Sequence, residues 1–119
     1  MRQSKAAPRP LNPQDGEPFA SAEEAWLWFS HCQIARIEGA RYSSGLSPQP
    51  RPCEPDDIYR AVTRLRLQRA LGPQHLQVLG RFGSRLAPPD PADGAGQLAL
   101  WEEALDRLET ALRPKGIVA

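Results

Sequence analysis

The stretch RLRLQRALGPQHLQVLGRFG, residues 64–83, joins two arginine-rich segments at Gly72 and Pro73. Glycine is common just past the end of a helix, and proline is common at the first position of one, because its missing N–H needs no partner there. Apolar residues on both sides of the junction recur at three- and four-residue spacing, as in amphipathic helices. We therefore predict one helix that ends at Gly72 and a short second helix that begins at Pro73 and ends at Gly83.

The first of these helices is predicted to begin at Pro55, after a connector over residues 40–55 that is rich in proline. Asp56 and Asp57 follow, at the positive end of the helix dipole, where carboxylates are stabilising. Tyr59 and Leu67 lie beside the apolar stripe of this helix. We expect the stripe itself to be buried: Ile58, Ala61, Val62 and Leu65.

An earlier helix is predicted over AEEAWLWFSHCQIARIE, residues 22–38. Ser21 precedes it as an N-cap with Glu24 at the capping-box position, and Gly39 suits a left-handed C-terminal position. Four consecutive apolar residues, Trp26 to Phe29, make the helix apolar around much of its circumference. Such a helix is usually central in its domain.

The last predicted helix, residues 97–113, has the clearest pattern, because five apolar side chains alternate at spacings of three and four and so share one face. Pro114 ends it, and we expect Ile117 and Val118 to fold back on the core. The five side chains are Leu98, Trp101, Leu105, Leu108 and Leu112.

These patterns predict an all-α protein, a small bundle of about four helices. Residues 1–18 form a proline-rich leader that we expect to be disordered, and residues 19–119 a single helical domain. Residues 83–96 are expected to be a loop. No apolar run is long enough to span a membrane, and the N-terminus lacks the apolar core of a secretory signal. We expect a cytoplasmic protein with reduced thiols at Cys32 and Cys53.

The charge is unevenly distributed along the chain. Net charge is +1, yet residues 58–85 contain six arginines and no acidic residue. Such a segment can contact the phosphates of DNA without reading bases. The candidate nucleic-acid-binding residues are Arg60, Arg64, Arg66, Arg69, Arg81 and Arg85.

Two other interpretations of the helices remain open. The arginines can form part of an ordinary charged surface, with Arg60 and Arg64 paired to acids of the last helix such as Glu102 or Glu109. Alternatively, the apolar excess can serve a protein partner or a second copy of the chain. The candidate partner-binding residues are then Leu98, Trp101, Leu105 and Leu108.

The sequence offers little for catalysis, metal binding or a cofactor. His31, Cys32, Cys53 and His75 are the only histidines and cysteines, and their spacing is not that of a zinc site. Phosphate-loop and nucleophile-elbow motifs are absent. Cys53, just before a predicted helix N-terminus, is a candidate reactive thiol or, more simply, a small apolar plug. We predict no enzyme, no metal and no cofactor.

LGPQHLQVLGRFG, residues 71–83, resembles the first half of the helix-turn-helix in the DNA-binding region of bacterial sigma factors and of phage antitermination-type regulators. LWEEALDRLETAL, residues 100–112, resembles the closing helix of such modules. The resemblance implies that the last helix, or its N-terminal end, approaches the major groove. Where those families have a short helix, this chain has SRLAPPDPADGAG, residues 84–96. The residues that match in the first half are Leu71, Val78, Leu79, Phe82 and Gly83.

The chain from Phe19 to Val118 is also similar to small uncharacterised proteins of alphaproteobacteria, which implies no activity. The shared segments are residues 25–29, 51–55, 75–79 and 115–118. Together with the arginines, the first resemblance leads us to predict a small DNA-associated, transcription-regulator-like protein. The alternative is a protein-interaction module or homo-oligomeric adaptor that does not bind nucleic acid.

Overall fold

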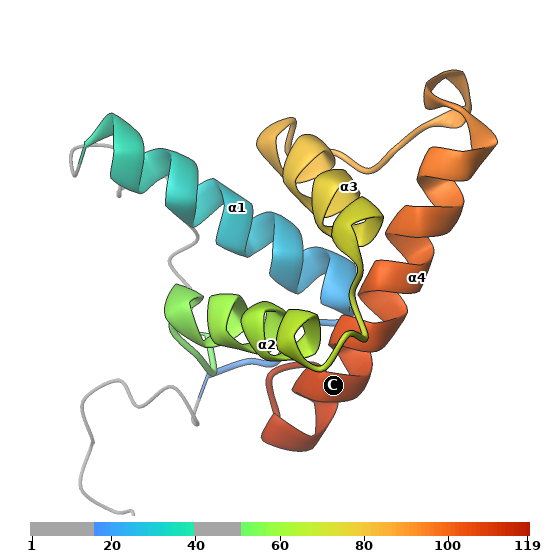
Figure 1. Ribbon diagram of the computed structural model, residues 1–119. Coiled ribbons are helices and arrows are strands. Elements are labelled where there is room, and N and C mark those ends of the chain that lie inside the picture. Colours follow the sequence, from blue (N-terminus) through green and yellow to red (C-terminus); the bar gives the residue numbers. More distant parts are fainter. Residues whose placement is uncertain (1–15, 40–50) are drawn as a thin grey trace, which may run out of the picture.

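The computed structural model describes residues 16–39 and 51–119. Residues 1–15 of the predicted leader and 40–50 of the predicted connector lie outside this part. Two short 3₁₀ turns, η4 (Pro91–Asp93) and η5 (Arg113–Lys115), flank the last helix (Figure 1). The all-α class is confirmed. The described α-helices are α1 (Ala22–Glu38), α2 (Pro55–Leu67), α3 (Pro73–Ser84) and α4 (Ala95–Leu112).

Helix α1 is central, as its apolar circumference predicts, and it contacts each of the other three helices. The backbone N–H of Glu24 donates to the Ser21 side chain at 3.2 Å, which confirms the N-cap. Farther along the helix, the indole N–H of Trp26 donates to the Leu79 carbonyl of α3 at 2.9 Å. Gly39 has φ 113° and ψ 155°, so it ends α1 outside the left-handed helical region that the sequence predicted.

Helix α2 ends at Leu67, five residues before the predicted end at Gly72. The chain turns through Arg69, whose φ of 64° is left-handed, and the N–H groups of Ala70 and Leu71 donate to the Leu65 carbonyl. This early turn brings the Leu71 side chain into the core, where it is 2% exposed. Gly72 instead precedes α3 as its N-cap.

Gly83 does not end α3, which continues to Ser84. A Cβ at Gly83 would lie 2.5 Å from the Ser30 hydroxyl and 3.0 Å from Trp26 Nε1. The glycine is therefore required where α3 crosses α1, rather than as a helix terminator. The space that a side chain would need there is filled by the side chains of Ser30 and Trp26 from α1.

Both ends of the described fold meet beside α4. Ile117 and Val118 fold back on the core as predicted, and Phe19 is already fully buried against them. The Phe19 N–H donates to the Ile117 carbonyl at 2.8 Å, and the Ala119 N–H donates to the Phe19 carbonyl at 2.9 Å. This single parallel bridge ties the start of the domain to its end.

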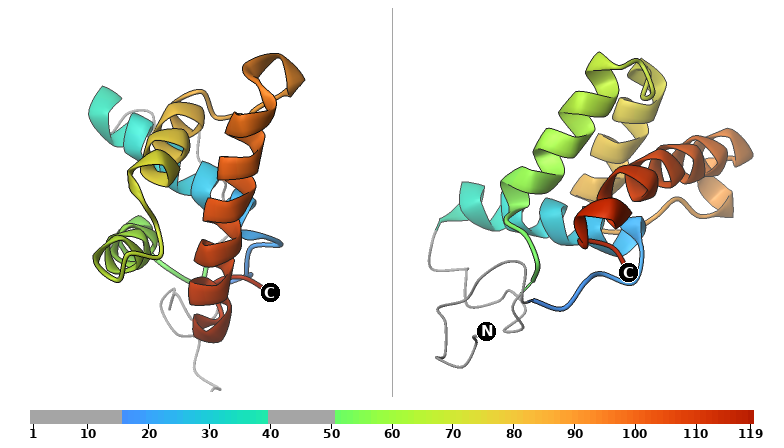
Figure 2. Two further views of the ribbon diagram at one scale, coloured as in Figure 1. Left: turned by 45° about the vertical axis from the view of Figure 1, so that its right-hand side comes forward. Right: turned by 90° about the horizontal axis from the view of Figure 1, so that it is seen from below.

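Helices α2 and α3 are consecutive in the chain, but they pack against α1 and α4 rather than against each other. Figure 1 shows them diverging from their shared turn, and in the view from below they overlap in projection (Figure 2, right). Each helix therefore presents an outer face. None of the helices in residues 16–39 and 51–119 is long and apolar enough to cross a membrane.

Candidate nucleic-acid interface

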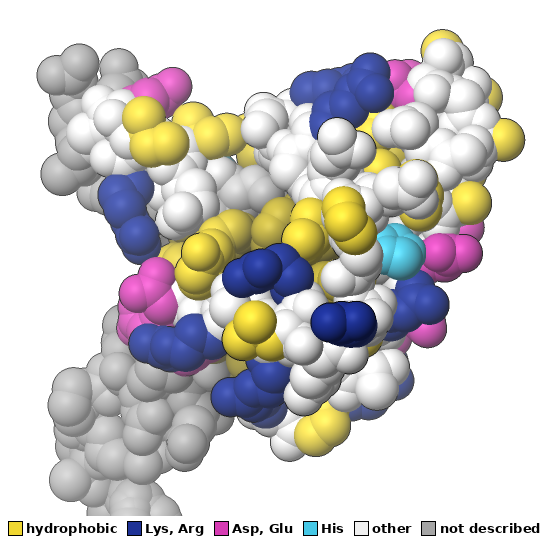
Figure 3. All heavy atoms as spheres, in the orientation of Figure 1, with side chains coloured by type: hydrophobic (Ala, Val, Ile, Leu, Met, Phe, Trp, Pro, Cys, Tyr) yellow, Lys and Arg dark blue, Asp and Glu magenta, His cyan; other side chains and the backbone are white. Residues whose placement is uncertain are grey.

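All six candidate arginines are exposed, but they fall into two groups. Arg60, Arg64 and Arg66 lie on α2, and Arg69 lies in the turn after it. Arg81 and Arg85 lie at the C-terminal end of α3. Figure 3 shows dark-blue side chains over α2 and, separately, near the end of α3 on the same face of the molecule.

Most arginines of the described chain have a carboxylate partner. The predicted pairing of Arg60 or Arg64 with Glu102 or Glu109 does not occur: Arg60 lies 2.9 Å from Asp57 on its own helix, and Glu109 pairs with Arg113. Helix spacing explains this, because residues three or four apart on one helix are already neighbours. The other pairs are Arg36–Asp56, Arg51–Glu24, Arg85–Asp93 and Arg107–Glu103.

Arg64, Arg66 and Arg69 differ from these. They lie at the C-terminal end of α2 and in the turn after it, where Arg64 and Arg66 project from different sides of the helix, and together we call them the arginine face. Each is exposed, and no carboxylate in residues 16–39 or 51–119 lies within 4 Å of it. Two large apolar side chains of α2 are also exposed, Tyr59 by 59% and Leu67 by 70%. The outer surface of α2 is therefore cationic at its C-terminal end and partly apolar along its length.

Both arginines at the C-terminal end of α3 lie near the Phe82 ring, and of the two only Arg85 has a carboxylate partner in the described chain. Arg85 pairs with Asp93 at 3.1 Å, and its guanidinium lies 4.9 Å from the ring centre of the buried Phe82. Arg81 lies 5.3 Å from the same ring and donates to the Gln97 side chain at 3.4 Å. A backbone hydrogen bond from Asp90, together with Arg85, lowers the pKa of Asp93, so that carboxylate stays charged beside Arg85.

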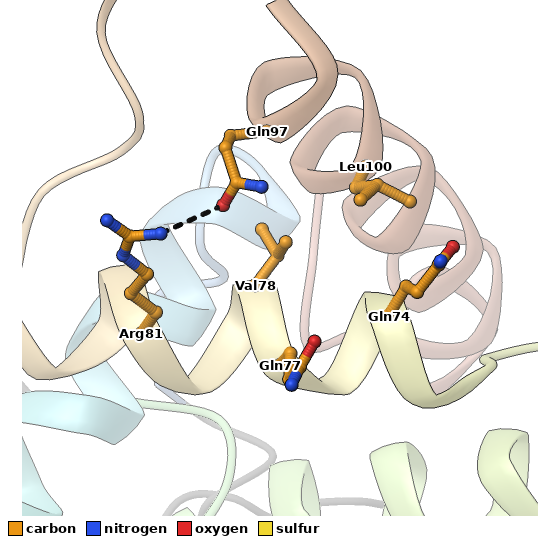
Figure 4. A pocket seen from close by; sticks show the side chains of 6 residues that line it. All are labelled: Gln74, Gln77, Val78, Arg81, Gln97 and Leu100. Carbon is orange, nitrogen blue, oxygen red and sulfur yellow. Dashed lines mark hydrogen bonds between the residues drawn. The ribbon is translucent and has the colours of Figure 1, made fainter. Parts of the chain in front are cut away.

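A hollow of about 370 Å³ lies between α3 and the N-terminal half of α4. In Figure 4, Arg81 and Gln97 meet at one side of it, and Gln74 lies toward the other. Val78 and Leu100 add an apolar component. Its polar lining consists of amides and one guanidinium, groups that together donate and accept hydrogen bonds.

Three of the four predicted partner-binding residues lie in the core rather than on a surface. Trp101, Leu105 and Leu108 are 1%, 8% and 0% exposed, because α1, α2 and α3 all pack against α4. Only Leu98 of that set is exposed, by 36%. Tyr59 and Leu67 are exposed apolar residues that sequence reasoning did not select as sites. The one signal for them was their position off the buried stripe of α2.

The outer face of α4 is acidic, with Glu102, Glu103 and Asp106 exposed. His75 Nε2 lies 2.9 Å from Glu103 Oε1, and the Gly72 N–H donates to His75 Nδ1 at 3.1 Å. Since Nδ1 accepts, Nε2 is the nitrogen that donates to Glu103. This hydrogen bond lowers the pKa of Glu103 and ties the start of α3 to α4.

Cys53 does not have the surroundings of a reactive thiol. It is 6% exposed, and burial, followed by the nearby Asp57 carboxylate, raises its pKa to about 12. Burial also raises the pKa of Cys32, and both cysteines are free thiols. Within the described ranges, no three His, Cys, Asp or Glu side chains gather as metal ligands would.

The chain was compared with models of protein families, with curated proteins and with solved structures. None of the three comparisons finds a match. What the protein does is therefore inferred from its own residues.

Proposed function

We propose that this protein binds duplex DNA, with the phosphate backbone held by the arginine face. The observation that carries the proposal is the contrast in ion pairing. Six arginines of the described chain lie within 4 Å of a carboxylate, whereas Arg64, Arg66 and Arg69, like Arg81 of α3, do not. Their charges are therefore available to an anionic partner.

The guanidinium groups of the arginine face are well suited to binding phosphate. Guanidinium groups donate paired hydrogen bonds to phosphate oxygens and stay charged at any physiological pH. Binding also releases counterions from DNA, which favours association at low salt. Contacts of this kind position a protein without reading sequence.

The placement of acids supports α2 as the side that faces DNA. The exposed acids of α4, Glu102, Glu103 and Asp106, would be repelled by phosphates. Contact between this face and a DNA groove is therefore unfavourable. The proposal therefore differs from the expectation that the last helix approaches the groove. Together with the resemblance to bacterial regulators, a DNA-binding role would place the protein in the cytoplasm, where bacterial DNA lies.

A salt titration of binding to fluorescent duplex DNA tests the proposal. We expect binding at low salt that weakens as salt rises, with a logarithmic slope of about −0.9 for each phosphate neutralised. Arg66→Glu should weaken binding and reduce the slope by about one. Lys115→Glu, an equal charge reversal at an exposed position on the short tail after α4, should change binding much less. Absence of binding at low salt, or binding indifferent to salt, would rule the proposal out.

A protein partner is the second candidate, and the exposure of Tyr59 and Leu67 favours it. Tyrosine and arginine are enriched at protein interfaces, and both lie on the outer side of α2. Sedimentation of the pure protein tests self-association. Dissociation of a dimer by Tyr59→Ala with Leu67→Ala, at unchanged DNA affinity, would support this candidate.

A further inference from the structure

Helix α3 has an outer stripe that contains no acid and little apolar surface. Gln74, Gln77, Gly80, Arg81 and Ser84 are all exposed, and their spacings of three and four place them along one side of the helix. No residue of α3 is acidic. A polar helix face without acidic residues can approach a surface lined by phosphates without repulsion between like charges.

The amides of this stripe are available for hydrogen bonding. In the part of the chain that the structure describes, neither Gln74 nor Gln77 makes a side-chain hydrogen bond, and both line the hollow beside α4. Arg81 has one long bond of 3.4 Å to Gln97 and no carboxylate partner within the described ranges. Figure 4 shows all three side chains extending from α3 around that hollow.

Gly80 leaves room on the same stripe. A Cβ there would meet nothing within 4 Å, so the position faces open space. The absence of a side chain lets the backbone of α3 approach a flat or grooved partner closely. A helix face with a glycine between polar side chains fits against the floor of a groove better than one with long side chains throughout.

Arginines stand at both ends of the helix. Arg66 and Arg69 precede its N-terminus, and Arg81 and Arg85 lie at its C-terminal end. A helix of 12 residues is about 18 Å long, and the major groove is about 12 Å wide. With α3 in the groove, the two arginine groups would reach toward the phosphates that border it.

We infer that α3 is the element that reads base edges, through Gln74, Gln77 and Arg81 in the major groove of duplex DNA. The inference rests on the proposed function, because the arginine face supplies the affinity. The glutamine amide donates to N7 of adenine and accepts from the adenine amino group. Arginine donates to O6 and N7 of guanine. The preferred site therefore contains an A·T pair next to or near a G·C pair.

Selection from a library of random duplexes at low salt tests this. The wild-type protein should enrich a short motif containing adenine and guanine. Gln74→Ala with Gln77→Ala should lose that enrichment by about tenfold or more, since each good bidentate contact discriminates to roughly that degree. Its affinity for bulk DNA and its salt slope should stay within about twofold, because the phosphate contacts remain.

Two further variants separate the outcomes. Gln68→Ala removes an exposed glutamine just before the turn and should keep the motif. Arg66→Glu should weaken binding to all sequences alike. Circular dichroism verifies that each variant is folded. Salt-sensitive binding with no enriched motif, or a motif that survives loss of both glutamines, overturns the inference and leaves the proposed function standing. Absence of any DNA binding by the wild type overturns the proposed function itself.

Discussion

The indole N–H of Trp26 donates to the backbone carbonyl of Leu79 at 2.9 Å, and this buried bond joins α1 to α3 where the two helices cross. The crossing leaves no space one turn later, at Gly83. We expect Gly83→Ala to destabilise the protein by about 1–3 kcal/mol, the usual range for an added methyl group in a packed region. The midpoint of urea denaturation measures it.

Gly80 is the matched control, because it is also a glycine inside α3 but faces open space. Alanine is about 1 kcal/mol more favourable than glycine within an exposed helix. Gly80→Ala should therefore stabilise the protein by up to that amount. Equal effects of the two substitutions would contradict the packing described for Gly83.

The pair formed by Asp93 and Arg85 predicts a pH dependence. The pKa of Asp93 lies below its ordinary value of 3.8, so folding favours the carboxylate. Its stabilising contribution is present above that ordinary value and is lost as the pH falls through the lower, folded-state pKa. Thermal melts between pH 2 and pH 5 should therefore show a steeper loss of stability for the wild type than for Asp93→Asn. Parallel curves would contradict it.

The same variant has a second readout in DNA binding. Asp93→Asn removes one negative charge and releases Arg85 from its partner at 3.1 Å. We expect tighter DNA binding at low salt, with the difference vanishing as salt rises. Fluorescence anisotropy at two salt concentrations measures it, and weaker binding by the variant would argue against a DNA contact at this end of α3.

The buried thiol of Cys53 should react slowly. A pKa of about 12, against an ordinary 9.0, leaves about a thousandfold less thiolate at neutral pH, and the side chain is nearly inaccessible. Iodoacetamide labelling followed by mass spectrometry should be at least about a hundredfold slower in the native protein than in urea. Comparable rates in the two conditions would show that this part of the core opens readily.

The helices could be predicted from the sequence because each has an apolar face of regular spacing. Two pairs of apolar residues are buried, as their places in the three- and four-residue spacing predict: Ile58 and Val62 of α2, and Leu108 and Leu112 of α4. The same pattern could not say which buried side chains would face a partner. Trp101 and Leu105 lie in the core because three other helices cover α4, and that coverage depends on the tertiary arrangement.

The helix ends and the ion pairs were harder to predict for a different reason. Gly72 and Gly83 were both predicted to end helices, but one begins α3 and the other permits close packing against α1. Charge counts located the arginines of residues 58–85 without showing their partners. Arg85 pairs with Asp93 because the loop before α4 passes the end of α3. Arg66 has no carboxylate partner among the described residues, which charge counts alone do not reveal.

Arg69 occupies a position that glycine would fill at lower energy. Its φ of 64° is left-handed, at the turn where a glycine usually follows a helix. Arg69→Gly should stabilise the protein by about 0.5–1 kcal/mol, because it relieves a left-handed cost of about 1–2 kcal/mol that the flexibility of glycine partly offsets. It should also weaken DNA binding, because it removes one cation of the arginine face. Leu86→Gly is the matched control, since Leu86 has a φ of 55° in the equivalent turn after α3 and carries no charge. It should leave DNA affinity unchanged. Thermal melts and binding titrations on the two variants separate these effects, and unchanged affinity in Arg69→Gly would remove Arg69 from the proposed interface.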